Sequence, residues 1–316
     1  MPSNKKAANN SRERSTAPQL VPGNPLFGLG YAKPVQRRIF VRVADSQQRN
    51  LEGAVAEEAP IAISYNGRPH VVMMATPADL KDFAVGFSLS EQIVSSAQDV
   101  SAIEVVKHAQ GVELQLQIGE DAADRLAQRV RNLVGRTSCG LCGVELIGDA
   151  LRAIDPVEPG VHFEIDALMR AEAALFGRQN WNQETGAMHA AAWAMSDGTL
   201  AIVREDVGRH NALDKVIGAL SRAEMDGGSN AREGFIVITS RASYELVQKT
   251  AVAGIPMIAA VSRPTGLAIR LAEATGIALI GLLRHDTANI YADSNAVLRL
   301  PPSADAVSEL ARRAPQ

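Results

Sequence analysis

Two cysteines separated by two residues are the clearest candidates for chemistry in this sequence. Cys139 and Cys142 lie in the glycine-rich segment 135–143. The nearby Arg136 can lower the pKa of a thiol, and glycines let the backbone of a partner approach closely. The pattern is compatible with a nucleophilic or sulfur-carrying thiol, with a dithiol redox pair or with inert cysteines. We favour the first, because the flanking residues are polar and flexible.

A metal site is not indicated. A structural zinc ion needs about four Cys or His ligands, and the six histidines show no spacing typical of metal ligands; they are His70, His108, His162, His189, His210 and His285. Zinc-dependent deamination would need a Glu two residues after the His. His189 is followed by two alanines, so we expect neither zinc nor deamination.

A second group of polar candidates follows predicted strands in the C-terminal half. Apolar segments at 200–204, 235–239, 257–261 and 277–283 are separated by polar or helical patterns. This rhythm predicts a largely parallel sheet covered by helices on both faces. Ligands of such sheets bind beyond the carboxyl ends of the strands. The candidates at these ends are Arg204, Asp206, Arg209, His210, Ser240, Arg241, Arg263, Arg284 and His285.

Arginine beside helix N-termini suits phosphate groups, because both supply donors and positive charge. The ligand indicated is therefore a nucleotide or another polyphosphorylated molecule. The alternative is that these arginines pair with acids of the same region, namely Glu205, Asp206, Asp214 and Glu245. The chain has neither a P-loop nor a Rossmann glycine pattern.

The N-terminal half predicts a smaller α+β domain. Alternation over 39–43 predicts a half-buried strand, and Asn66-Gly67 between apolar runs predicts a hairpin. Thr76 is expected to cap a helix that Pro77 begins. Two further strands, near 103–107 and 112–118, and a helix over 122–133 follow. We divide the chain into a disordered polar tail (1–34), this domain (35–134), a loop and linker carrying both cysteines (135–155) and a ligand-binding domain (156–316).

Composition excludes several classes of protein. The 316 residues carry a formal charge of −3, which argues against a nucleic-acid binder. No apolar run reaches the roughly 18 residues that a membrane span needs, and no secretory signal is present. We therefore expect a cytoplasmic protein with reduced thiols and no membrane partner.

Several motifs together resemble one known family. The segments 137–143 and 204–215 and the run Thr239-Ser240-Arg241 are similar to those of the formate dehydrogenase accessory sulfurtransferase family (FdhD). The resemblance covers roughly residues 37–295, and the run from Asp206 to Lys215 is its most specific part. It implies an α/β fold in which a three-layer, cytidine deaminase-like domain with a mixed, mostly parallel sheet follows the smaller α+β domain.

The resemblance also implies an activity. A cysteine desulfurase would supply sulfur, Cys139 would carry it as a persulfide, and Cys142 would be a secondary thiol. The acceptor would be the molybdenum cofactor, as bis-molybdopterin guanine dinucleotide, before it enters formate dehydrogenase. The protein is expected to be a homodimer. The segment matching the cofactor-binding region of the family consists of Leu282, Leu283, Arg284, His285, Asp286 and Thr287.

Two other functions remain open at the level of sequence. A non-catalytic chaperone for the molybdenum cofactor would need the strand-end arginines but not the thiols. A dithiol redox protein would need a reversible Cys139–Cys142 disulfide.

Overall fold

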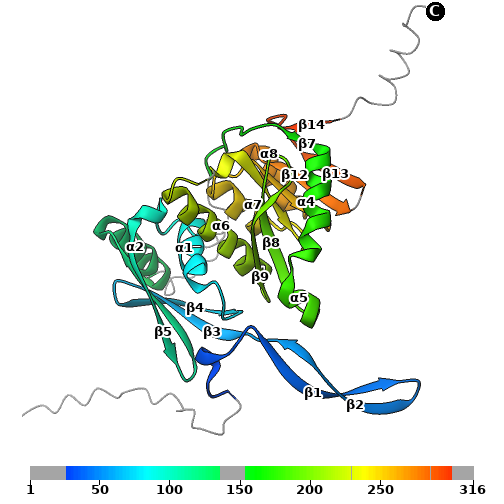
Figure 1. The fold of residues 1–316 in the computed structure, drawn as a ribbon. Helices are drawn as coiled ribbons and strands as arrows, with labels where there is room; N and C mark the ends of the chain where they lie inside the picture. The colour runs from blue at the N-terminus through cyan, green and yellow to red at the C-terminus, as the bar shows by residue number, and fades with distance from the viewer. Residues whose placement is uncertain (1–25, 136–153, 229, 285, 301–316) are drawn as a thin grey trace, which may run out of the picture.

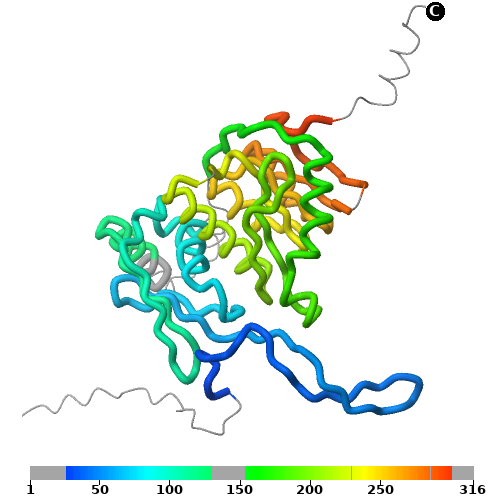
Figure 2. Tube along the Cα trace, viewed as in Figure 1, coloured from blue at the N-terminus to red at the C-terminus, as the bar shows by residue number. Residues whose placement is uncertain are grey.

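The structure, a computed structural model, describes residues 26–135, 154–228, 230–284 and 286–300. Figure 1 shows a large sheet with helices on both sides, a smaller sheet beside it and a long two-stranded arm. The tube in Figure 2 shows how the arm, in blue, extends away from both sheets. No described helix combines the length and the apolar character needed to cross a bilayer.

The arm is the antiparallel pair β1 (Val35–Ala44) and β2 (Gln47–Ala56). The predicted strand is confirmed, but its predicted half-burial is wrong. Ile39, Val41 and Val43 are all exposed, because no second layer covers these side chains of β1 in the described part of the chain.

The smaller sheet has the strand order β4-β3-β6-β5. Its hairpin, β3 (Ala59–Tyr65) and β4 (Arg68–Ala75), turns at Asn66-Gly67, where both residues have positive φ, as predicted. β5 (Val100–His108), β6 (Gly111–Ile118) and α2 (Glu120–Gly135) extend the predicted segments. Phe83 and Phe87 of α1 (Leu80–Ser90) complete the core of this domain.

The large sheet has the strand order β13-β12-β11-β10-β8-β9. The hairpin of β8 (His189–Met195) and β9 (Leu200–Asp206) is antiparallel, and so is the pairing of β8 with β10 (Gly234–Ile238). β10, β11 (Met257–Ala260) and β12 (Ala278–Arg284) are parallel, and β13 (Thr287–Ala292) closes the sheet antiparallel to β12. The sheet is thus mixed, and four of its strands (β9, β10, β11 and β12) run in one direction.

Both faces of the large sheet are covered, as predicted. On β10, Phe235 and Val237 face α4 (Ile165–Gly177), whereas Ile236 and Ile238 face the opposite layer. That layer consists of α6 (Arg209–Met225), α7 (Tyr244–Val252) and α8 (Gly266–Thr275). The remaining elements are short: α5 (Asn180–Thr185), the pair β7 (Phe163–Glu164) and β14 (Leu298–Arg299), and single turns at Leu29–Tyr31, Ala97–Asp99 and Ala231–Glu233.

The two domains meet where α1 crosses α6. A Cβ on Gly86 would collide with the carbonyl oxygen of Asp214, and one on Gly218 would collide with that of Asp82. Glycine at both positions therefore lets the two helix backbones touch. This close crossing fixes the smaller domain against the helical layer of the larger one.

Candidate functional site

The candidate site lies where β9, β10, β11 and β12 end. We call this side of the large sheet, formed by the carboxyl ends of these strands, the edge. Because these strands run in one direction, their carboxyl ends meet at this edge. We call the arginines placed here the edge arginines: Arg209, Arg241, Arg263 and Arg284. None of their guanidinium groups forms an ion pair with an acidic side chain in the described part of the chain. One of these arginines thus lies at, or a few residues after, the end of each of the four strands.

The turn after β9 leads directly into α6. Its N-cap residue, Gly208, supplies no side-chain oxygen, and the first helical residue is Arg209. The Nε of Arg209 is buried and has no hydrogen-bond partner. The helix start and this donor together offer unsatisfied N–H groups at the edge.

A similar arrangement follows β10. Ser240 is buried and donates to the carbonyl of Arg241 (3.1 Å), which fixes the turn. Ser243 is the N-cap of α7, yet its side chain caps no helical N–H, and its hydroxyl is buried without a partner. α7 therefore also presents an open N-terminus beside an edge arginine, a combination that suits an anionic group.

The end of β12 has an irregular backbone. Leu282 has a φ of 52°, which is unusual for a side chain of this size, and the register with β13 shifts there. The amide of Leu282 donates to the carbonyl of Ser262 (3.2 Å), which ties this bend to the end of β11. Strained backbone of this kind persists where neighbouring structure enforces it, often at functional sites.

The predicted segment 282–287 divides into two parts. Leu283 is fully buried in the core, so its role is packing, whereas Arg284, Asp286 and Thr287 are exposed. The Thr287 hydroxyl donates to the carbonyl of Arg284 (3.2 Å) and closes the turn between β12 and β13. His285 lies outside the described residues.

Asp206 is placed differently from the edge arginines. Its side chain is 0% exposed, and so is that of Lys215, whose Nζ lies 2.6 Å from Oδ2 of Asp206. The carboxylate also accepts from the amides of Thr76 (3.0 Å) and Gly208 (2.8 Å) and from the Asn211 side chain (3.1 Å). Each oxygen of the Asp206 carboxylate thus has two partners. Asp206 therefore holds the turn between β9 and α6 in place, and it could contact a ligand only if these hydrogen bonds opened.

The prediction that Thr76 caps a helix beginning at Pro77 is wrong. Thr76 does not cap α1, which begins four residues later at Leu80; instead its hydroxyl accepts from the amide of Val207 (3.1 Å). Its carbonyl accepts from Lys215 (3.1 Å). Thr76 thus joins the smaller domain to the turn between β9 and α6.

Two further ion clusters join the domains. Arg204 is one of the arginines expected to contact phosphate, but its guanidinium donates to Asp82 through Nε (3.0 Å) and an Nη atom (2.7 Å). Arg222 pairs with the same carboxylate. Lys249 contacts Asp214 (3.0 Å) and donates to Ser90 (2.9 Å). Burial raises the pKa of Asp214 although Lys249 pairs with it.

The predicted acidic partners of the arginines are thus mostly used elsewhere. Asp206 and Asp214 hold lysines, and Glu205 accepts from the amides of Trp181 (3.0 Å) and Asn182 (2.7 Å). Burial raises the pKa of Glu205. Glu245 lies beside a histidine and not beside an arginine: its carboxylate is 2.7 Å from Nε2 of His210.

Two histidines beside the edge arginines have lowered pKa values. Burial lowers the pKa of His189, helped by the charge of Arg209. Burial also lowers the pKa of His210, and Arg209 adds to this while Glu245 opposes it. Both rings therefore protonate less readily in the folded protein than in the unfolded chain, where the pKa is about 6.5.

We predict that the free energy of unfolding falls as the pH is lowered below about 6.5. In this range the unfolded chain binds more protons than the folded one, so acid favours unfolding. His189→Gln should make the decline shallower, which urea unfolding at several pH values between about 5.5 and 7.5 would measure. An equally steep decline in the variant would contradict the assigned role of His189.

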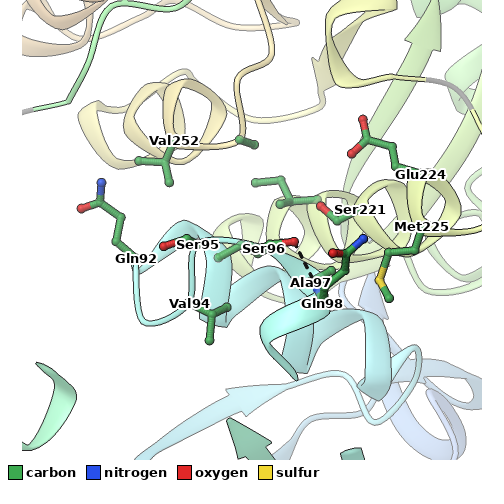
Figure 3. Close-up of a pocket in the computed structure, with 13 residues that line it drawn as sticks. Gln92, Val94, Ser95, Ser96, Ala97, Gln98, Ser221, Glu224, Met225 and Val252 are labelled. Atoms are coloured by element: carbon green, nitrogen blue, oxygen red, sulfur yellow. Dashed lines mark hydrogen bonds between the residues drawn. The ribbon is translucent and has the colours of Figure 1, made fainter. Parts of the chain in front are cut away.

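One cavity of about 230 Å³ lies beside the end of β9 and is lined by Arg204, Glu205 and Asn180 among others. Two larger cavities lie away from the edge. Figure 3 shows one of about 500 Å³ between the loop after α1 and the C-terminal half of α6, lined by Ser95, Gln98, Ser221 and Glu224 among others. Arg209 stands at the other end of α6, about 25 Å along a helix of this length. Another, of about 540 Å³, lies between the β3–β4 hairpin and α2.

Cys139 and Cys142 lie outside the described residues. Among the residues described, no three His, Cys, Asp or Glu side chains gather in a group that could hold a metal ion.

Comparisons with known proteins give a consistent result. The model of the FdhD/NarQ family matches residues 56–298. A protein of Xanthomonas euvesicatoria named sulfur carrier protein FdhD is 52% identical over 254 residues, which is 80% of this chain and 89% of that protein. One of the same name from Cupriavidus necator is 51% identical over 238 residues, or 75% of this chain and 81% of that protein.

A solved structure is similar in fold. The crystal structure from Desulfotalea psychrophila, assigned provisionally as a formate dehydrogenase accessory protein, superposes with a TM-score of 0.63. It is 22% identical in sequence, and the match covers 81% of this chain and 96% of that one.

Proposed function

This chain belongs to the FdhD/NarQ family, and we propose that it is a sulfurtransferase that serves formate dehydrogenase. In this proposal it receives sulfur from a cysteine desulfurase, carries it as a persulfide on Cys139 and passes it to the molybdenum cofactor. The names of the relatives, sulfur carrier protein, support the carrier step. The cofactor, as bis-molybdopterin guanine dinucleotide, is the substrate that accepts the sulfur.

The carrier step follows from thiol chemistry. The thiolate of Cys139 attacks the terminal sulfur of the donor's persulfide, and the donor cysteine leaves as a thiolate. The S–S bond of the Cys139 persulfide would then break, with its electron pair left on Cys139 as the regenerated thiolate. The terminal sulfur would pass to the molybdenum centre, which would supply the two electrons that turn it into a sulfido ligand. Cys142 is the secondary thiol in this scheme.

The acceptor would be held at the edge of the large sheet. The structural observation that supports this most is the row of edge arginines, none with an acidic partner among the described residues, beside the open N-termini of α6 and α7. The two pyrophosphates of the cofactor carry the negative charge that such a row recognises. Ser240, His210 and the segment around Arg284 would border the same site.

We propose a fold, a compartment and an oligomeric state as well. The larger domain would be cytidine deaminase-like, the protein would act in the cytoplasm, and it would form a homodimer. Its mixed sheet, with helices on both faces, is compatible with the first.

Nucleotide binding tests whether the edge arginines hold the phosphates of the cofactor. We predict that Arg241→Gln weakens the binding of GDP, used as a probe for one half of the cofactor, by about tenfold or more, because it removes a charge-assisted contact to phosphate. Arg232→Gln is the matched control, since Arg232 precedes β10 and so lies at the opposite edge of the sheet.

Isothermal titration calorimetry of the wild type and both variants measures the effect. GDP affinity that is unchanged in Arg241→Gln, or reduced equally by Arg232→Gln, would remove the support for this site. Failure of the wild type to bind GDP at all would do the same.

A further inference from the structure

The cavity in Figure 3 lies between the two domains, and the proposed sulfur transfer does not use it. Its volume of about 500 Å³ is within the usual range for a pocket that holds a small molecule. The smaller domain contributes the end of α1 and the loop after it, and the larger domain contributes the last turns of α6 and α7. A molecule bound here would therefore touch both domains.

Three helices end at this cavity. Leu89 near the end of α1 and Val252 at the end of α7 line it, and so do Glu224 and Met225 in the last turn of α6. The C-terminal end of a helix carries a partial negative charge that attracts cations. The arrangement of the helices therefore favours a positively charged ligand.

The side chains of the lining have the same preference. Of the described residues that line the cavity, only Glu224 is charged. The nearest basic side chains on these helices are already paired: Arg222 of α6 with Asp82, and Lys249 of α7 with Asp214. Neither of these two cations lines the cavity, so the helix ends there keep their negative potential.

The carboxylate of Glu224 is held in place and has an oxygen to spare. Its Oε1 atom accepts from the amide of Ala231, in the turn before β10, and Oε2 has no hydrogen-bond partner among the described residues. Burial raises the pKa of Glu224, and the charge of Glu233 adds to this. A cation bound at the carboxylate would offset both effects.

The rest of the lining combines neutral polar groups with apolar ones. Within the described part of the chain, the side chains of Gln92, Gln98 and Ser221 form no hydrogen bond, so their oxygens are available to a ligand. The larger aliphatic residues of the lining are Leu89, Val94, Ile217 and Val252. The cavity therefore fits a molecule that has a cationic head and a short alkyl chain.

We propose that this cavity binds a small aliphatic amine or guanidine, with the cationic group at Glu224 and the alkyl chain between the two domains. This proposal does not rest on sulfur transfer. The edge arginines lie beyond the other end of α6, so the two proposals can fail separately.

Two probes with the same alkyl chain, n-hexylammonium and 1-hexanol, test the preference for a cation. Ligand-observed NMR titration of the full wild-type chain gives both dissociation constants. We expect n-hexylammonium to bind about tenfold or more tightly than 1-hexanol, because only the ammonium group can pair with a carboxylate. Equal affinities, or no binding of n-hexylammonium, would overturn the proposal, and this comparison needs no variant.

Glu224→Gln tests the place of binding. Glutamine keeps an oxygen for the Ala231 amide but loses the charge, so n-hexylammonium should bind about fivefold or more weakly, with 1-hexanol little changed. Asp226→Asn is the matched control, since this exposed carboxylate lies two residues further on and does not line the cavity. Its loss should change the affinity by no more than about twofold, because solvent and salt screen an exposed charge.

Ser221→Trp places a large ring in the cavity and should weaken the binding of both probes. Unchanged affinity of n-hexylammonium for Glu224→Gln and for Ser221→Trp would overturn the proposal, because the cation would then bind elsewhere. An equal loss in Glu224→Gln and Asp226→Asn would do the same, because it would show attraction to the negative surface in general.

Discussion

A Cys139→Ala variant will gain no sulfur when it is incubated with a cysteine desulfurase and cysteine, whereas the wild type will gain one persulfide sulfur. Alanine has no thiolate to attack the persulfide of the donor, so the loss should be complete. Intact-mass spectrometry measures the added sulfur, and the addition should disappear on treatment with a reductant.

Cys142→Ala is the matched control for this experiment, because it removes a thiol three residues away in the same segment. We expect this variant to keep its sulfur on Cys139. Sulfur on Cys139→Ala, or a wild type that takes up none, would contradict the carrier role.

The Cys139→Ala variant also distinguishes sulfur transfer from the chaperone and redox alternatives. If Cys139→Ala supports full maturation of formate dehydrogenase in cells, the protein is a chaperone that holds the cofactor. A reversible Cys139–Cys142 disulfide with a defined potential, found by thiol trapping, would instead favour a redox protein. Sulfur transfer predicts loss of maturation with Cys139→Ala.

Lys215→Met will destabilise the protein by about 3–5 kcal/mol, because it leaves a buried carboxylate without its cation. Asp206 and Lys215 are both inaccessible to solvent, and the pair also binds Thr76 of the smaller domain. Removing the ammonium therefore leaves the Asp206 charge uncompensated and also deprives the Thr76 carbonyl of a donor. Urea unfolding of the full chain measures the loss.

Two other variants test whether the Asp206–Lys215 pair joins the two domains. Lys81→Met, at an exposed position of α1, should change the free energy of unfolding by no more than about 0.5 kcal/mol. Thr76→Val removes only the hydroxyl that accepts from Val207 and should cost about 1–3 kcal/mol. A loss below about 1 kcal/mol in Lys215→Met would show that the pair does not hold the domains together.

Local sequence patterns predicted much of the larger domain. The apolar runs that became β10, β11 and β12 are buried on both faces, so they differ sharply from the helices between them. Gly254 and Gly276 have positive φ after α7 and α8, which is why the ends of these helices could be recognised.

Patterns that depend on tertiary contacts were misread. The start of α6 was not recognised as a helix, because Arg209 follows a glycine N-cap with no side-chain cap. Thr76 has the local signature of a cap, but the distant Asp206 and Val207 take its hydrogen bonds. Alternation in β1 suggested one buried face, since sequence does not show whether a second layer is present.

The same limit explains which contacts of the candidate residues could not be predicted and which residues were missed. Asp206 was placed with the ligand-binding groups because it ends a strand, yet the lysine that neutralises it is nine residues further along the chain. Asp82 and Lys249, which hold the domains together, lie within ordinary helical patterns. Nothing in their spacing indicates a partner in another domain.

Sulfur transfer from loaded protein to the molybdenum cofactor tests the central claim most directly. Wild-type protein carrying labelled sulfur on Cys139 is mixed with the purified cofactor, and the label is followed from protein to cofactor. We predict transfer from the wild type, and little transfer from a loaded Arg241→Gln/Arg263→Gln double variant, because its thiol is intact but its cofactor site is not. Equal transfer from both proteins, or none from the wild type, would contradict the account.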